Sequence, residues 1–158
     1  MRSKLAVRSP AQPQEQTMSF PRPANTPWLV PYLTVRDAAA AIAFYRDAFG
    51  FGVQDAVHDH GRPIHVEMTY QGQLILMFAP NGAFGSTARA PAAGGFECPQ
   101  SFHLYCEDVD AVYRRALEHG ATSIMPPDNV FWGERYAAVR DPDGYRWGLA
   151  CHPAGAPA

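Results

Sequence analysis

Short runs of apolar residues, each followed by an amphipathic segment, occur twice along the chain. Residues 28–35 are mainly apolar and lead into DAAAAIAFYRDAFG, and residues 101–106 lead in the same way into DVDAVYRRALEHG. Apolar residues recur at helical spacing in both segments, so each is predicted to be a helix that follows a strand. Asp37 and Asp108 are suited to accept hydrogen bonds from the first N–H groups of these helices, and a glycine ends each of them.

Three short strands are predicted after each helix. They cover residues 51–57, 64–70 and 73–79 in the first half, and 122–125, 134–140 and 145–151 in the second. Gln71-Gly72 and Asp141-Pro142-Asp143-Gly144 have the composition of tight turns between neighbouring strands. A βαβββ pattern therefore occurs twice. The predicted fold class is α+β, with two four-stranded sheets around a cleft and helices on the outer faces.

The chain is expected to form one domain between two tails. Residues 1–26 contain several prolines without a periodic apolar pattern, and Met18 is an alternative start. The expected divisions are a tail at 1–26, module one at about 27–80, a linker at 81–100, module two at about 101–152, and a tail at 153–158.

Alternation along the strands predicts which side chains face the cleft, because successive residues of a strand point to opposite faces. Val66 and Met68 are assigned to the helix-packed face, together with Ile75 and Met77 across the turn. The opposite set is aromatic and apolar with a few polar groups, which is typical of a small-molecule site, the alternative being a solvated sheet face. It comprises Tyr32, Thr34, His65, Glu67, Leu76, Phe78, Ser101, His103, Tyr105, Tyr136 and Arg146.

Composition narrows the possible partners. Of the 158 residues, 47% are hydrophobic and 18% charged, with a formal net charge of −2, so we expect a folded protein that binds neither nucleic acid nor a membrane. No apolar run approaches the ~20 residues of a membrane span, and no signal peptide is expected. Cys98, Cys106 and Cys151 show no CxxC spacing, which favours free thiols and a cytoplasmic location.

Four segments carry a resemblance to a known family: VPYLTVRDAAAAIAFYRDAFGF, HVEMTYQGQLILMF, EDVDAVYRRALEHGA and WGERYAAVRDPDGYRWGLA. Together with the repeated βαβββ pattern, they resemble the vicinal oxygen chelate superfamily, and within it the PhnB-like subgroup, from about Trp28 to His152. This superfamily includes glyoxalase I, bleomycin-resistance and fosfomycin-resistance proteins, and extradiol dioxygenases. The resemblance also implies a homodimer.

The resemblance implies four metal-ligand positions, which fall on Val30, Leu76, Ser101 and Gly148. None of these residues is a usual metal ligand, so neither a metal nor another cofactor is expected. The alternative is a displaced metal site formed by His65, Glu67 and His103.

Two functions follow from the resemblance. The first is a metal-free protein that binds a small, partly aromatic molecule in its cleft, as bleomycin-resistance-type sequestering proteins do. The alternative is a glyoxalase-like lyase or isomerase, either with the displaced metal site or with His103 and Glu67 as metal-independent acid and base.

Overall fold

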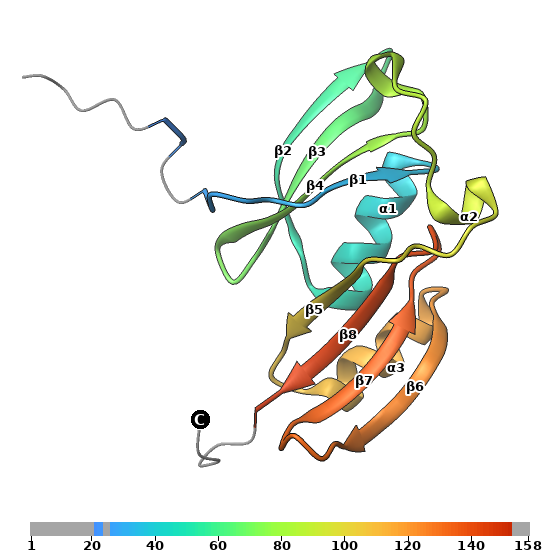
Figure 1. The fold of residues 1–158 in the computed structure, drawn as a ribbon. Helices are drawn as coiled ribbons and strands as arrows, with labels where there is room; N and C mark the ends of the chain where they lie inside the picture. Colours follow the sequence, from blue (N-terminus) through green and yellow to red (C-terminus); the bar gives the residue numbers. More distant parts are fainter. Residues whose placement is uncertain (1–20, 24–25, 153–158) are drawn as a thin grey trace, which may run out of the picture.

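The computed structural model describes residues 21–23 and 26–152, and it contains two βαβββ modules (Figure 1). The expected tail residues 1–20, 24, 25 and 153–158 lie outside the described residues. Module one consists of β1 (Tyr32–Val35), α1 (Ala38–Phe44), the π-helical turn η1 (Tyr45–Phe49), β2 (Gly52–Asp59), β3 (Arg62–Tyr70) and β4 (Gln73–Pro80). Module two consists of β5 (Ser101–Tyr105), α3 (Val109–Glu118), β6 (Thr122–Asn129), β7 (Arg135–Arg140) and β8 (Arg146–Cys151). The linker carries η2 (Ala83–Gly85) and α2 (Pro91–Gly94).

Each module forms one four-stranded mixed sheet. The strand orders are β1-β4-β3-β2 and β5-β8-β7-β6, and in both sheets the first strand runs parallel to the last strand of its module. The predicted α+β class with two βαβββ sheets is confirmed. Within the described ranges, no helix has the length and apolar character needed to span a membrane.

The helices begin where the sequence predicts. The Asp37 carboxylate accepts a hydrogen bond from the Ala40 N–H at 2.8 Å, and Asp108 accepts one from the Ala111 N–H at 2.9 Å. Gly50 ends the first helix in the left-handed region with φ of +77°.

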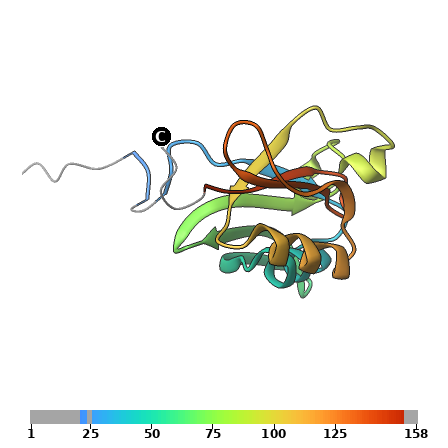
Figure 2. The same ribbon diagram turned by 90° about the horizontal axis from the view of Figure 1, so that it is seen from below.

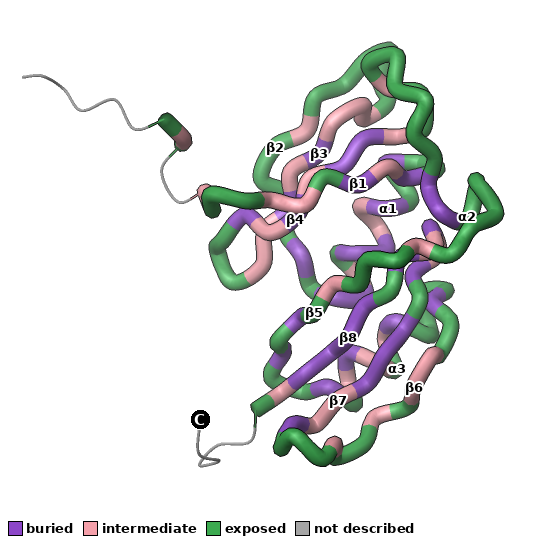
Figure 3. Tube along the Cα trace, viewed as in Figure 1, coloured by how far each residue is buried: buried purple, intermediate pink, exposed green. Residues whose placement is uncertain are grey.

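The two modules share a single layer of helices. Figure 2 shows α1 and α3 on the same side of both sheets, and the buried residues of both modules form one apolar core. Tyr45 and Phe49 of module one pack against Trp147 of module two, with ring centroids 5.6 and 5.1 Å apart. In Figure 3 the buried positions run along β7 and β8, whereas β4 alternates between buried and intermediate positions. The two sheets of one chain therefore lie side by side over shared helices, where the sequence analysis expected them to face each other across a cleft.

Strand β4 contains a β-bulge that corrects the predicted facing of its side chains. Beyond the two-residue turn, Thr69 pairs with Leu74, but the next pair is Met68 with Leu76, so β4 has one extra residue. The bulge places Leu76 (1% exposed) and Phe78 (0%) in the core. The prediction that Leu76 and Phe78 lie on the sheet face opposite the helices, called the open face below, is wrong. Met77 takes that face instead, in register with Glu67 and Tyr32.

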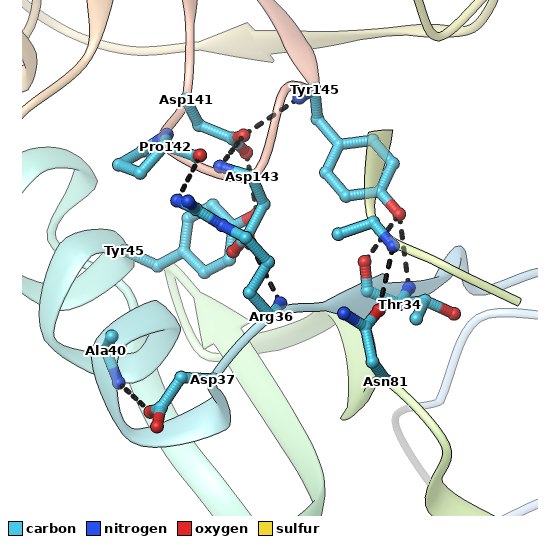
Figure 4. Close-up of polar contacts among 11 residues, drawn as sticks. Thr34, Arg36, Asp37, Ala40, Tyr45, Asn81, Asp141, Pro142, Asp143 and Tyr145 are labelled. Carbon is cyan, nitrogen blue, oxygen red and sulfur yellow. Dashed lines mark hydrogen bonds and ion pairs between the residues drawn. The ribbon is translucent and has the colours of Figure 1, made fainter. Parts of the chain in front are cut away.

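A buried carboxylate in the turn between β7 and β8 joins the two modules (Figure 4). Asp141 accepts hydrogen bonds from the Tyr45 hydroxyl at 2.8 Å and from Trp147 Nε1 at 2.9 Å. It also accepts from the backbone N–H groups of Asp143 and Tyr145, at 3.0 and 2.9 Å. Burial raises the pKa of Asp141 to about 6, while the Trp147 and Tyr45 hydrogen bonds act in the opposite direction. At neutral pH the carboxylate is therefore ionised and fully occupied by donors.

Two further polar contacts connect the same turn to β1. The Tyr145 hydroxyl donates to the Thr34 carbonyl at 2.8 Å and accepts from the Thr34 N–H at 3.2 Å. The Arg36 backbone N–H and Nε both donate to Asp143 Oδ1, at 2.9 and 3.0 Å. These bonds satisfy part of the free edge of β1 and fix its position relative to module two.

The β4 bulge predicts different effects for two adjacent substitutions. Phe78→Ala removes a fully buried ring and should lower the free energy of unfolding by about 3–5 kcal/mol. Met77→Ala changes a half-buried side chain on the open face and should cost about 1 kcal/mol or less. Urea unfolding of both variants checks this, and a larger loss for Met77→Ala would contradict the register.

The contact between Tyr45 and Asp141 predicts a second stability difference. Tyr45→Phe removes one donor from a buried carboxylate and should cost about 1.5–3 kcal/mol. Tyr113→Phe is the matched control, because the Tyr113 hydroxyl donates to Ser123 in an exposed contact, and about 0.5 kcal/mol or less is expected. Thermal and urea unfolding measure both, and equal losses would argue against Asp141 as the link between the modules.

Candidate functional site

The open face of the module-two sheet carries a cluster of aromatic side chains. Tyr105 and Tyr136 flank Ala150 in register, and His103 lies beside Gly148. The His103 and Tyr136 rings are stacked, with centroids 5.7 Å apart and an interplanar angle of 29°. A Cβ on Gly148 would come within 2.6 Å of the Tyr136 hydroxyl, so the glycine lets this ring lie across the central strand.

Glu134, just before β7, is the polar centre of this cluster. Its Oε2 accepts a hydrogen bond from Trp132 Nε1 at 2.7 Å, and its Oε1 accepts one from the Tyr105 hydroxyl at 2.9 Å. His103 Nε2 lies 3.9 Å from Oε2, and the Glu134 side chain is only 10% exposed. The Trp132 ring meets Tyr136 edge to face at 5.7 Å. We refer to His103, Tyr105, Trp132 and Tyr136 together with Glu134 as the ring cluster.

The hydrogen bonds determine which groups of the cluster are charged. Those from Trp132 and Tyr105 hold the pKa of Glu134 below its ordinary value, because both stabilise the carboxylate. The same contact raises the pKa of Tyr105, which therefore remains a protonated donor at neutral pH. The ring cluster thus encloses a negative charge.

The open face of the module-one sheet carries a separate chain of polar side chains. The Tyr32 hydroxyl lies 2.7 Å from His65 Nδ1, and His65 Nε2 lies 3.5 Å from Glu67 Oε1. Gln54 Nε2 donates to the other Glu67 oxygen at 2.9 Å. Partial burial raises the pKa of Tyr32. With the ring proton on Nε2 facing Glu67, His65 accepts a hydrogen bond from Tyr32 through Nδ1.

The structure separates the acid–base pair that the sequence analysis proposed. Glu67 contacts His65 and Gln54 on one sheet, whereas His103 is next to Glu134 on the other. The side-by-side arrangement of the sheets is the reason. Within one chain, His103 and Glu67 therefore do not form the expected pair.

The remaining predicted residues occupy different positions on the two sheets. Ser101 and Arg146 are exposed register partners at the far end of β5 and β8 from Tyr105. Thr34 is half-buried, and its backbone is bound by Tyr145. Leu76 and Phe78 belong to the core.

The donor set does not fit the metal site that the resemblance implies. Leu76 is buried on the helix-packed face, and Gly148 offers no donor and is covered by the Tyr136 ring. Among the described residues, no group of three or more His, Cys, Asp or Glu side chains has an arrangement suited to a metal ion. His65 and Glu67 also lie on a different sheet from His103, so these three do not meet as the displaced site requires.

Sequence reasoning missed two members of the ring cluster, Trp132 and Glu134. Trp132 lies in the turn between β6 and β7, where alternation along a strand gives no information. Glu134 begins the strand predicted at 134–140, and alternation gives it the same facing as Tyr136. The sequence signal for a contact between the two side chains was Trp132-Gly133-Glu134, in which a glycine turn separates an indole from a carboxylate. The cluster also needs the hydrogen bond from Tyr105, which lies 29 positions away from Glu134 in sequence and cannot be inferred from this segment.

Comparison with known protein families identifies the family of this chain. The family model of the Glyoxalase/Bleomycin resistance protein/Dioxygenase superfamily matches residues 27–149. The chain belongs to this superfamily. The coarser resemblance is thus confirmed, while the PhnB-like subgroup stays a prediction.

Two curated relatives and one solved structure illustrate what this chain is similar to. The chain is 37% identical over 131 residues to the uncharacterized protein Mb0911c of Mycobacterium bovis, covering 78% of this chain and 82% of that protein. It is 27% identical over 119 residues to the putative glyoxylase CFP32 of Mycobacterium tuberculosis, covering 74% of this chain and 42% of that protein. The crystal structure of TioX from Micromonospora sp. ML1 superposes with a TM-score of 0.62 at 25% identity, covering 78% of this chain and 98% of TioX.

A second solved structure supports the fold alone. A glyoxalase/bleomycin resistance protein/dioxygenase family enzyme from Burkholderia phytofirmans has a TM-score of 0.59 at 20% identity, with 77% of this chain and 95% of that chain covered.

Proposed function

We propose that this superfamily member binds a small, partly aromatic molecule on the open faces of its sheets, without a metal or other cofactor, as a sequestering protein of the bleomycin-resistance type. The observation that carries the proposal is the ring cluster around Glu134. Its rings offer stacking area to a ligand, with Tyr105 59% and Trp132 50% exposed. Glu134 fixes two of these rings through hydrogen bonds, so little side-chain freedom is lost when a ligand binds.

Under the same proposal the protein acts as a homodimer in the cytoplasm. The two sheets of one chain lie side by side. In the proposed dimer, the module-one sheet of one chain lies opposite the module-two sheet of the other. The large apolar side chains of Trp28 and Leu29, 76% and 86% exposed beside β1, support burial against such a copy. The Tyr32–His65–Glu67 chain would then complete the site. A formal net charge of −2 fits a small-molecule partner rather than nucleic acid or a membrane.

The proposal predicts ligand-induced stabilisation that depends on the ring cluster. In a thermal-shift screen of aromatic compounds, a binder at about a hundred times its dissociation constant should stabilise the protein by ~2.7 kcal/mol. Tyr136→Leu removes a stacking ring without touching Glu134 and should weaken binding about tenfold, measured by calorimetry. Tyr113→Phe, outside the ring cluster, should bind as the wild type does. A broad panel without any binder, or a binder indifferent to Tyr136→Leu, would refute the proposal.

A second function, a glyoxalase-like lyase or isomerase, is favoured by the Tyr32–His65–Glu67 chain. Glu67 orients the His65 ring, and His65 can exchange a proton with Tyr32 across their 2.7 Å contact. The exposed Tyr32 oxygen can then take the proton from the carbon next to a carbonyl group of a bound compound, while its own proton passes to His65 Nδ1. In this version of the enzyme hypothesis, His65 and Glu67 act as the acid–base pair, and His103 contacts the ligand as part of the ring cluster.

Proton exchange tests this second function. Proton NMR would follow deuterium incorporation next to the carbonyl in α-hydroxy ketones and in hemithioacetals of α-keto aldehydes. Tyr32→Phe and His65→Ala should each lower the rate about a hundredfold, whereas the exposed His58→Ala should not change it. An unaltered rate in Tyr32→Phe would remove the acid–base role of this chain.

A further inference from the structure

We infer that the ring cluster recognises the positively charged nitrogen of an organic ammonium ligand. The inference deepens the proposed function and rests on it, because it names the chemical class of the ligand at the same site. The ring cluster combines four aromatic rings with one enclosed carboxylate, and each feature favours a cation independently.

The charge of Glu134 is not cancelled by its hydrogen-bond partners. Trp132 and Tyr105 donate to it as neutral groups, so the carboxylate keeps its full negative charge. The Arg135 guanidinium, adjacent in sequence, is engaged elsewhere: it donates to both Asp110 oxygens, at 2.6 and 2.8 Å. Among the described residues, the one ion-pair contact of Glu134 is His103 at 3.9 Å. A negative potential therefore extends from Glu134 to the surrounding rings.

The rings themselves attract cations through their faces. A cation within about 6 Å of a Trp or Tyr ring centroid is held by the ring quadrupole, most strongly by Trp. The ring centroids are 5.0 Å apart for His103 and Tyr105, and 5.7 Å apart for Trp132 and Tyr136. Donation from the indole N–H and the phenol O–H to a carboxylate polarises these rings further.

The hydrogen-bond pattern also indicates the type of cation. Both oxygens of Glu134 already accept a short hydrogen bond, and the side chain is largely enclosed. A primary ammonium gains less there, because the enclosed carboxylate, only 10% exposed, leaves its remaining lone pairs difficult for N–H groups to reach. A quaternary or fully alkylated ammonium needs none and presents an apolar surface to the rings. The positive side chains on the same face lie at its other end: Arg146 pairs in register with Ser101 and with Arg140. Ser101 is four residues along β5 from Tyr105, about 13 Å away.

The test compares choline with its uncharged tert-butyl analogue, which has the same shape without the charge. Calorimetry, with the indole N–H signal of Trp132 in NMR as a second readout, should show that the wild type prefers choline by about tenfold. Glu134→Gln keeps an acceptor for one of the two donors, so it should abolish this preference by lowering the affinity for choline more than the affinity for the analogue. Glu118→Gln, which alters an exposed module-two carboxylate on α3 outside the ring cluster, should keep it.

The outcomes separate this inference from the function on which it rests. Equal affinity of the wild type for both probes would overturn the inference, whether or not Glu134→Gln folds. A preference for choline that persists in Glu134→Gln would also overturn the inference. If neutral aromatic compounds still bind in either case, the proposed function stands and only the ligand class is wrong. If neither the probes nor the aromatic panel binds to the wild type, both are refuted.

Discussion

The hydrogen bonds that converge on Asp141 determine how the two halves of this protein sit together. A buried carboxylate is costly unless its lone pairs are satisfied, and here the donors come from both modules: Tyr45 from the first, Trp147 and the turn backbone from the second. The two modules thus share one aromatic core and one helix layer. Both sheets are left with an open face on the side away from the helices.

This arrangement assigns different chemistry to each open face. Module one presents a hydrogen-bonded chain that ends in the exposed Tyr32 hydroxyl, and module two presents aromatic rings around the Glu134 charge. Small residues on β8, above all Gly148, let the rings lie close to the sheet. Two of the positions that the family pattern assigns to metal ligands, Leu76 and Gly148, carry no donor here, and Leu76 is part of the core.

Much of the fold could be predicted from sequence because it is encoded locally. Capping aspartates, terminal glycines and turn residues act over a few positions, and the helices start at Asp37 and Asp108 as expected. Alternation also placed His103 and Tyr105 correctly on the open face of β5. It failed in β4, where one extra residue reversed the facing of Leu76 and Phe78, because nothing in an apolar run such as QLILMF marks the position of a bulge.

The sequence by itself determined the elements, their order, the repeated module and the polar character of most open-face positions, since each depends on neighbours a few residues apart. Only the tertiary structure decided which groups meet. It paired Glu67 with His65 instead of His103, joined Glu134 to Tyr105 and Trp132, and set the sheets side by side. These outcomes depend on hydrogen bonds and packing between residues distant along the chain, and a pattern of short period carries no information about such contacts.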